Sequence, residues 1–265
     1  MGPSSIHGAM SGPDPERLGG IAWARRTQGT LSAAERRALF AAIVRGQGEY
    51  LAGLLKFATG RTPAGARSLR VDDLAPPDSA FARAAEDACR EQPPHVAGHG
   101  YRTWMYGSAL ATLDGIRLDP EQFYVASLLH DYGIAEPVAG QDFTVRSAAR
   151  IERCAGEVGL DPEVAAAVMD AVTVHATVGV SVAVDGATGV YVQSGAMFDL
   201  GGLRVGDLTR AYRNAVIAQH PREGVSAAII ALIAAEARAV PGGRFAQLHR
   251  CGLTLVVRAN PLRPR

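Results

Sequence analysis

Helix-start signals recur along this sequence, and they constrain its fold more than any other feature. The run Asp119-Pro120-Glu121 places an N-capping acid before a proline at the first helical position, and Asp161-Pro162-Glu163 repeats the pattern. Ser32 followed by Glu35 forms a capping box ahead of an amphipathic run. Counting such segments gives seven or more helices and little convincing strand. The sequence therefore predicts an all-α fold.

Two segments need separate treatment. In "VGVSVAVDGATGVYVQ", residues 178–193, alternating valines flank Asp185-Gly186 and favour a hairpin, whereas the Gly and Ala content equally favours a loop leading into a helix. Both interpretations stay open. The run "REGVSAAIIALIAAEARAV", residues 222–240, is apolar on most of its circumference, which predicts a central core helix.

The domain organisation follows from where Gly, Pro and Ser gather. Residues 1–25 begin with a stretch rich in all three and are expected to form a flexible N-terminal segment. No Pro/Gly linker divides the remainder into comparable halves. We therefore expect a single helical fold over residues 26–265, with its core within residues 73–240.

Composition and charge narrow the class of partner. With 48% apolar and 20% charged residues, the chain resembles a soluble globular protein, and its net charge of +1 provides no basic face for nucleic acid. No apolar run is long enough for a membrane span. We expect a small-molecule substrate, no nucleic acid and no membrane, and leave a homo-oligomer open. Three scattered cysteines, Cys89, Cys154 and Cys251, suit reduced thiols in the cytoplasm.

The stretch "VASLLHDYGIAEP" ends an apolar run with two metal-binding side chains, His130 and Asp131. A helix that starts at Asp119 reaches His130 after about three turns, and Gly133 has the spacing of a C-cap. The pair is therefore expected at the inner end of a buried helix, where its two side chains can converge on one point.

Further candidate ligands lie up and down the chain. His95 and His99 are one helical turn apart, and Arg102 shares the face of His99. His175 ends the helix that begins at Asp161. Asp199 stands among apolar residues and glycines, and a buried carboxylate there needs a positive partner, which a divalent cation would supply.

These motifs resemble the HD-domain superfamily of metal-dependent hydrolases. The similarity lies in "HGYRTW" at His99, "ASLLHDYG" with His130 and Asp131, and the isolated Asp199, and it extends from about residue 73 to residue 210. Within the superfamily the chain looks most like the cyanamide-hydratase-like branch. The resemblance implies an HD-domain helical bundle around one divalent ion held by His99, His130, Asp131 and Asp199.

The types of ligand atom and the number of histidines indicate which metal is expected and how many ions the site holds. Mixed nitrogen and oxygen ligands suit zinc first, with iron, manganese or nickel as alternatives. Dinuclear members of the superfamily carry more histidines between the His-Asp pair and the last Asp, whereas this chain has only His175 there, so one ion is expected. The chain also has Thr144 where many cyanamide-hydratase-like members carry an acid, which leaves the exact substrate open.

The resemblance implies an enzyme, a hydrolase or hydro-lyase. It would add metal-activated water to a nitrile- or amide-like small molecule, with Asp131 taking a proton and His175 or Arg102 steadying the developing charge. One alternative is an HD phosphohydrolase acting on a nucleotide-like phosphomonoester, which would need more positive charge at the pocket. Another is a non-catalytic ligand-binding protein that the metal stabilises.

Several residues keep two interpretations. His95 is expected to support the site, with ligation as the alternative. His175 either packs in the core against a backbone carbonyl or lines the pocket, and Arg102 either contacts substrate or pairs with an acid behind the ligands. Tyr132 and Thr177 are expected to pack rather than line the pocket. The glycines near Gly195, Gly201 and Gly202 are expected to allow close helix packing.

Overall fold

The computed structural model describes residue 14 and residues 16–262, and this part of the chain is built from helices without a β-strand. The predicted all-α fold with seven or more helices is confirmed. The α-helices are α1 (Ile21–Thr27), α2 (Ala33–Ala58), α3 (Ala80–Glu91), α4 (Pro94–Leu113), α5 (Pro120–Leu129), α6 (Phe143–Glu157), α7 (Pro162–Val174), α8 (Val182–Asp185), α9 (Ala187–Gly201), α10 (Arg210–Gln219), α11 (Val225–Ala239), α12 (Arg244–Arg250) and α13 (Leu253–Arg258). Short 3-10 turns cover Ala64–Arg67, Val71–Asp73, Tyr132–Ala135 and Val205–Asp207.

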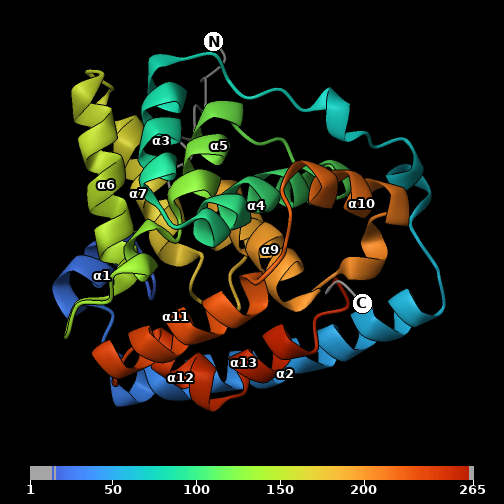
Figure 1. The fold of residues 1–265 in the computed structure, drawn as a ribbon. Helices are drawn as coiled ribbons and strands as arrows, with labels where there is room; N and C mark the ends of the chain where they lie inside the picture. The colour runs from blue at the N-terminus through green and yellow to red at the C-terminus, as the bar shows by residue number, and fades with distance from the viewer. Residues whose placement is uncertain (1–13, 15, 263–265) are drawn as a thin grey trace, which may run out of the picture.

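The helices form two groups (Figure 1). Helices α3 to α7 and α9 pack on one another, with α4 against α9 and α5 between α3, α4 and α7. Helices α2, α11, α12 and α13 lie together along the other side of the molecule (Figure 1). The largest core cluster belongs to the first group and includes Tyr106, Phe123, Leu128 and Phe198. Among the described residues, no helix combines the length and apolar character that crossing a bilayer requires.

The predicted start signals work as local chemistry requires. Asp119 and Asp161 accept hydrogen bonds from backbone amides in the first turns of α5 and α7, each with proline at the first helical position. Ser32 and Glu35 form the complete capping box of α2. Helix α3 is capped in the same way by the Ser79 side chain, which accepts a hydrogen bond from the Ala82 amide.

Residues 178–193 form no hairpin. A loop, the four-residue α8 and then α9 occupy this stretch, so the loop-to-helix interpretation is correct. The α9 surface explains why small residues occur there: a Cβ at Gly189 would approach the Val174 side chain to 2.3 Å. Gly and Ala in this stretch therefore reflect close helix packing rather than a turn between strands.

The expectation of a central core helix at residues 222–240 is wrong. Helix α11 packs against α4, α12 and α13, but within it only Val225, Ile229, Ile233 and Glu236 are buried. Its broad apolar circumference has another cause, because Ile229 and Ile233 also line the cavity described below. A helix face that lines an apolar cavity has the same apolar sequence pattern as a face that packs in the core.

The predicted flexible segment, residues 1–25, extends too far. Residues 1–13 and 15 lie outside the described residues, but residues 21–25 belong to α1, which packs on α6 and α7. Trp23 is buried, and the Arg17 side chain makes ion pairs with Asp170 and Asp185. The Gly, Pro and Ser content of the first 20 residues gave no indication that Arg17 and Trp23 hold this end of the chain to the fold.

Gly133 is not the predicted helix C-cap. Helix α5 ends at Leu129, and Gly133 lies in the 3-10 turn without a positive φ. A Cβ on Gly133 would lie 2.1 Å from the Phe143 carbonyl oxygen, so the residue is needed for the close approach of α6. This contact fixes the turn directly after the His130-Asp131 pair.

Gly195 confirms the expected role of glycine in helix packing. It lies in α9 against α4, where an added Cβ would be 2.2 Å from the Thr103 carbonyl oxygen and 2.9 Å from the Gly107 amide nitrogen. Both neighbours are backbone atoms and cannot rotate away. The α4–α9 crossing therefore depends on glycine at this position.

We expect Gly195→Ala to lower the free energy of unfolding by about 1–3 kcal/mol, because the added methyl group forces α4 and α9 apart. Urea unfolding followed by circular dichroism measures this change. Gly156→Ala in α6 is the matched control: its Cβ would meet nothing within 4 Å, so the helix preference for alanine leaves stability unchanged or slightly raised. Equal effects of the two substitutions would contradict this account.

Candidate metal centre

Helix α5 carries the His130-Asp131 pair into the interior. Every residue from Phe123 to Leu129 is buried, so the helix is held on all sides. His130 is the C-cap and keeps helical backbone angles, whereas Asp131 departs from them with φ −103° and ψ 11°. The break in the helix turns the second side chain, so that adjacent residues face one point, as predicted. His130 and Asp131 are both buried.

His99 reaches the same point from α4. Its Nε2 lies 3.3 Å from His130 Nε2 and 3.6 Å from Asp131 Oδ2, and His130 Nε2 lies 3.5 Å from the same oxygen. His99, His130 and Asp131 are all buried and offer ligand atoms within 4.8 Å of one another. Of the four predicted ligands, the structure brings these three together.

The ring orientations are set by what each Nδ1 contacts. His130 Nδ1 donates to the Ser127 carbonyl at 2.8 Å, and His175 Nδ1 donates to the Val172 carbonyl. His99 Nδ1 donates to Asp199 Oδ2 at 2.8 Å. Carbonyl and carboxylate oxygens only accept, so the proton of each neutral ring is on Nδ1. The Nε2 lone pairs of all three rings are then available to a ligand, an arrangement typical of metal-binding histidines.

The distances fit a metal ion. When both rings are neutral with Nδ1 protonated, their Nε2 lone pairs face each other 3.3 Å apart and gain nothing from this contact without an ion between them. Two nitrogens about 2.05 Å from one tetrahedral ion lie about 3.4 Å apart. The observed separations of 3.3–3.6 Å among His99, His130 and Asp131 match that spacing. The donor set, two imidazoles and one carboxylate, suits a divalent ion.

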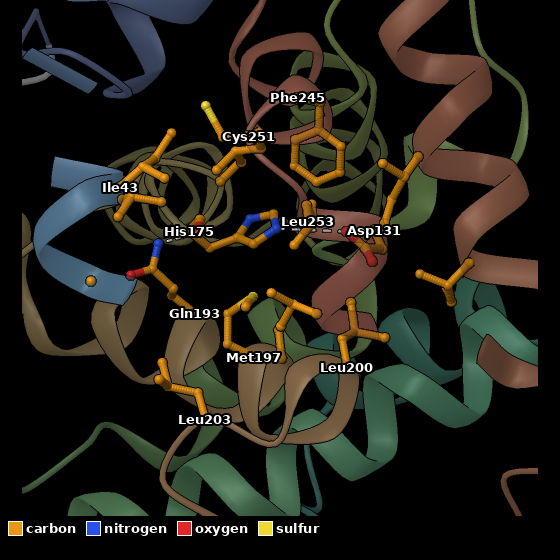
Figure 2. Close-up of a pocket in the computed structure, with 18 of the residues that line it drawn as sticks. Ile43, Asp131, His175, Gln193, Met197, Leu200, Leu203, Phe245, Cys251 and Leu253 are labelled. Atoms are coloured by element: carbon orange, nitrogen blue, oxygen red, sulfur yellow. Dashed lines mark hydrogen bonds and ion pairs between the residues drawn. The ribbon is translucent and has the colours of Figure 1, made fainter. Parts of the chain in front are cut away.

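His175 lies on the other side of Asp131. Its Nε2 is 3.6 Å from Asp131 Oδ1, the oxygen that does not face His99 and His130. Figure 2 shows the His175 ring pointing toward the Asp131 carboxylate, and both residues line the cavity. Both interpretations of His175 hold in part, because Nδ1 is satisfied by a backbone carbonyl while the ring lines the cavity.

Asp199 lies behind His99 rather than beside the other ligand atoms. Its Oδ2 accepts from His99 Nδ1, and its Oδ1 accepts from Arg102 Nε at 2.9 Å and Arg222 Nε at 2.7 Å. Asp199 is absent from the group of converging ligand atoms. The structure therefore places this predicted ligand as the carboxylate that orients His99. The positive partner it needs comes from two arginines.

Arg102 does not line the cavity. It is fully buried and contacts Asp199 and the carbonyl oxygens of His220 and Pro221, which matches pairing with an acid behind the ligands rather than substrate contact. Sequence reasoning missed Arg222. It follows His220-Pro221 in an otherwise ordinary polar stretch, and the only available signal was the need of Asp199 for positive charge.

The charges of the site follow from burial and these pairs. Burial acts to raise the pKa of Asp199, but Arg102 and Arg222 outweigh it and hold the pKa well below its usual range. Burial likewise opposes ionisation of Asp131, yet His130, His175 and His99 keep its pKa below the ordinary value. Burial lowers the pKa of His130 to about 3, although Asp131 opposes that shift. His130 is therefore neutral at pH 7, as metal ligation requires.

The remaining predicted residues lie outside the cluster. His95 is half-buried on α4 and has no ligand atom in the converging group. The Tyr132 hydroxyl donates to Glu91, and Thr177 accepts from Arg244, so neither lines the cavity, as expected. Thr144 is buried and hydrogen-bonds Asp142 and Arg244, which assigns it a structural role.

A cavity of about 180 Å³ opens over the cluster (Figure 2). His99, His130, Asp131 and His175 form its polar end. The walls are mainly apolar side chains from both groups of helices: Ile43 of α2, Met197 and Leu200 of α9, Ile229 and Ile233 of α11, Phe245 of α12 and Leu253 of α13. Among the residues that line it, none is Lys or Arg.

No model of a known protein family matches the chain, and no curated protein matches it either. The function proposed below therefore rests on the metal-binding group His99, His130 and Asp131 and on the cavity above it.

The metal-free protein should lose stability in acid through His130. An unfolded histidine with a pKa near 6.5 takes up a proton that folded His130, with a pKa of about 3, does not. The free energy of unfolding should then fall as pH drops from 6.5 toward 3, by up to about 1.4 kcal/mol per pH unit. Urea unfolding at pH 7 and pH 5 with chelator present measures this. In His130→Asn the free energy of unfolding should depend less steeply on pH. An unchanged pH dependence would contradict the conclusion that His130 causes the loss of stability in acid.

Proposed function

We propose that the protein is a mononuclear metal-dependent hydratase or hydrolase of the HD-domain superfamily, related to the cyanamide-hydratase type, that adds water to a small neutral molecule. The observation that carries the proposal is the convergence of His99, His130 and Asp131 at the polar end of an otherwise apolar cavity. Membership of the superfamily is supported by the residue pattern and by the all-α fold that the pattern implies.

His99, His130 and Asp131 would hold the ion, with zinc as the first candidate. When bound, the ion supplies Lewis acidity and lowers the pKa of a coordinated water toward neutrality. Among the described residues no second group of three metal-binding side chains gathers, which supports a single ion. The free thiols of all three cysteines suit the reducing cytoplasm that we propose as its location.

His175 is better placed than Asp131 to receive a proton. Its Nδ1 is committed to the Val172 carbonyl, so Nε2 presents a lone pair to the cavity beside Asp131 Oδ1. The pKa of Asp131 lies below its ordinary value, which makes that carboxylate a weak base. We therefore propose that His175 takes up and returns the proton, while Asp131 holds the ion and orients the protonated ring.

The cavity lining favours an uncharged substrate. A phosphomonoester brings negative charge, which proteins neutralise with Arg, Lys or backbone amides, and no cationic side chain lines this cavity. The phosphohydrolase alternative is thus less well supported. The reaction we favour is hydration of a nitrile carbon to an amide, in which the carbon gains the water oxygen and the nitrogen gains both protons.

The cavity size indicates an apolar substituent on that substrate. An engineered apolar cavity of about 150 Å³ binds benzene, and this one is slightly larger. Cyanamide, with three heavy atoms and no hydrocarbon group, would leave most of the wall unfilled. A nitrile or amide that carries a ring or a branched aliphatic chain would fill the cavity and contact its apolar walls.

Tyr50 should contribute to binding at the other end of the substrate. It lines the cavity from α2, and its hydroxyl is buried without a hydrogen-bond partner among the described residues. We expect Tyr50→Phe to raise KM for a substrate with a polar group there by about 5- to 10-fold, with kcat little changed, because a neutral hydrogen bond contributes about 1 kcal/mol. Steady-state kinetics would measure it, and an unchanged KM for every substrate would contradict this role.

The proposed function is tested by incubating the zinc-loaded protein with benzonitrile, branched aliphatic nitriles, cyanamide, primary amides and p-nitrophenyl phosphate. Amide formation from the apolar nitriles, faster than hydration of cyanamide, is the expected result. Activity should be lost in His175→Ala and kept in His95→Ala, whose histidine lies outside the cluster. Phosphate release without hydration would favour the phosphohydrolase, and no turnover combined with unfolding on metal removal would favour the non-catalytic alternative.

A further inference from the structure

Helix α2 is long but poorly covered. Of its 26 residues, only Leu39, Ala42 and Ile43 are buried. Figure 1 shows it running along the edge of the molecule, beneath α12 and α13. Most helical stability in proteins comes from packing, so a helix of this length with so little covered surface is expected to have a further partner.

The uncovered face of α2 is apolar. Phe40, Val44, Leu51 and Leu55 are 54%, 52%, 65% and 68% exposed, and the spacing of 4, 7 and 4 residues places them on one side of the helix, away from the buried residues. We call these four residues the α2 stripe. Ala41, Gly48 and Ala52 lie beside it and are also exposed. Contiguous large apolar side chains on a surface indicate a binding face, and small neighbours allow a second helix to approach closely.

The α2 stripe is symmetric along the sequence. Val44 and Leu51 are equally far from the midpoint between Gln47 and Gly48, and so are Phe40 and Leu55. Two antiparallel copies related by a two-fold axis at this midpoint would pair Val44 with Leu51, and Phe40 with Leu55, twice over. Such self-complementarity is what a two-fold interface between identical chains requires. We propose that the protein forms a homodimer in which α2 packs antiparallel against α2 of a second copy.

The charges of α2 agree with this register. Arg37 lies on the face of the α2 stripe near the N-terminal end, and in the antiparallel pair it falls beside the other copy's Ala58, where α2 ends. The C-terminal end of a helix carries partial negative charge, so an arginine there is favourable. In a parallel pair each Arg37 would instead face the Arg37 of the other copy. The antiparallel arrangement removes that repulsion.

Dimerisation would also support the cavity. Ile43, Gly46, Gln47 and Tyr50 line the cavity from the side of α2 that adjoins the α2 stripe, roughly 100° around the helix. The helix would then be held on two neighbouring faces, with one toward the cavity and one toward the second copy. The dimer does not depend on what the cavity binds, so its test is separate from that of the proposed function.

Light scattering coupled to size exclusion of the full chain tests the proposal. The wild type should have twice the mass of one chain at micromolar concentration, and Leu51→Glu should have the mass of one chain with an unchanged circular dichroism spectrum. Leu255→Glu is the matched control, because Leu255 of α13 is 63% exposed but outside the α2 stripe, and it should stay dimeric. A monomeric wild type, a dimeric Leu51→Glu or a monomeric control would each overturn the proposal.

Cysteine cross-linking tests the register. Copies of residue 48 would be offset by about 1.5 Å along the helix axes, so Gly48→Cys should form an intermolecular disulfide on mild oxidation. Copies of residue 52 would be offset by about 13 Å, so Ala52→Cys should stay reduced. Wild type, with its own three free thiols, provides the background. Equal cross-linking of both variants would indicate a parallel pair and contradict the antiparallel register.

Discussion

Asp131→Ala is expected to strip the metal from the purified protein and to reduce turnover to background. Asp131 is the only carboxylate in the converging group, and its two oxygens contact different histidines: Oδ2 lies near His99 and His130, and Oδ1 near His175. Alanine removes a ligand and the charge that balances the ion. Metal affinity should fall by more than the 10- to 100-fold that is typical of a residue supporting a ligand.

Metal content after dialysis against a weak chelator, measured by elemental analysis, provides the readout for this variant. His95→Ala is the matched control, since it removes a histidine from the same helix as His99 without touching the cluster. The control should keep the metal of the wild type. If the Asp131→Ala protein kept as much metal as the wild type, the ion would have to bind elsewhere.

Asp199→Ala is expected to destabilise the protein by about 3–5 kcal/mol, because it leaves charged groups buried without their partner. Arg102 is fully buried, and Arg222 nearly so, and both donate to Asp199 Oδ1. Asp199→Asn should cost less stability while weakening metal binding about 10- to 100-fold, since an amide orients the His99 ring less well. Urea unfolding of the metal-free variants measures the first effect and zinc titration the second.

Asp114→Ala is the comparison for that variant. Asp114 pairs with Arg204 near the surface, where the two side chains are 36% and 29% exposed, and also accepts a hydrogen bond from the Tyr191 hydroxyl. Removing one exposed ion pair and one neutral hydrogen bond costs about 1–2 kcal/mol. If Asp199→Ala costs no more than Asp114→Ala, the buried cluster does not stabilise the fold as described. If Asp199→Asn loses as much metal as Asp131→Ala, Asp199 is a direct ligand, as the resemblance to the HD-domain superfamily implies.

The positions of His130 and Asp131 were predictable because local chemistry determines them. The N-cap at Asp119 sets where α5 begins, and an apolar helix of about three turns must then deliver the pair to the interior. His99 lies within α4, which begins at Pro94, and its place beside the pair was expected from the resemblance to the HD-domain superfamily. The helix starts are short-range signals that a single sequence carries, whereas the meeting of α4 and α5 was implied by the resemblance alone.

The role of Asp199 could not be settled in the same way. The sequence shows that a carboxylate among apolar residues needs positive charge, but a metal ion and a distant arginine meet that need equally well. Arg222 is 23 residues further on, and only the tertiary fold brings it to Asp199. The position of α11 was unpredictable for a related reason, because an apolar helix face does not reveal whether it meets a core or a cavity.

The character of the cavity also depends on the tertiary fold. Its walls come from α2, α9, α11, α12 and α13, which lie far apart in the sequence. No local pattern identifies Ile43, Ile233 and Leu253 as neighbours. The preference for an apolar group on the proposed substrate therefore rests on the tertiary fold, whereas the sequence predicts only a nitrile- or amide-like small molecule.

The central claim is that His99, His130 and Asp131 hold one metal ion. Isothermal titration of the chelator-treated protein with zinc tests it most directly, because the measurement reports stoichiometry and affinity without reference to any substrate. We expect one zinc per chain, with release of few protons at pH 7 because His130 is already neutral, and no binding in Asp131→Ala. Absence of binding to the wild type, or two ions per chain, would contradict the account.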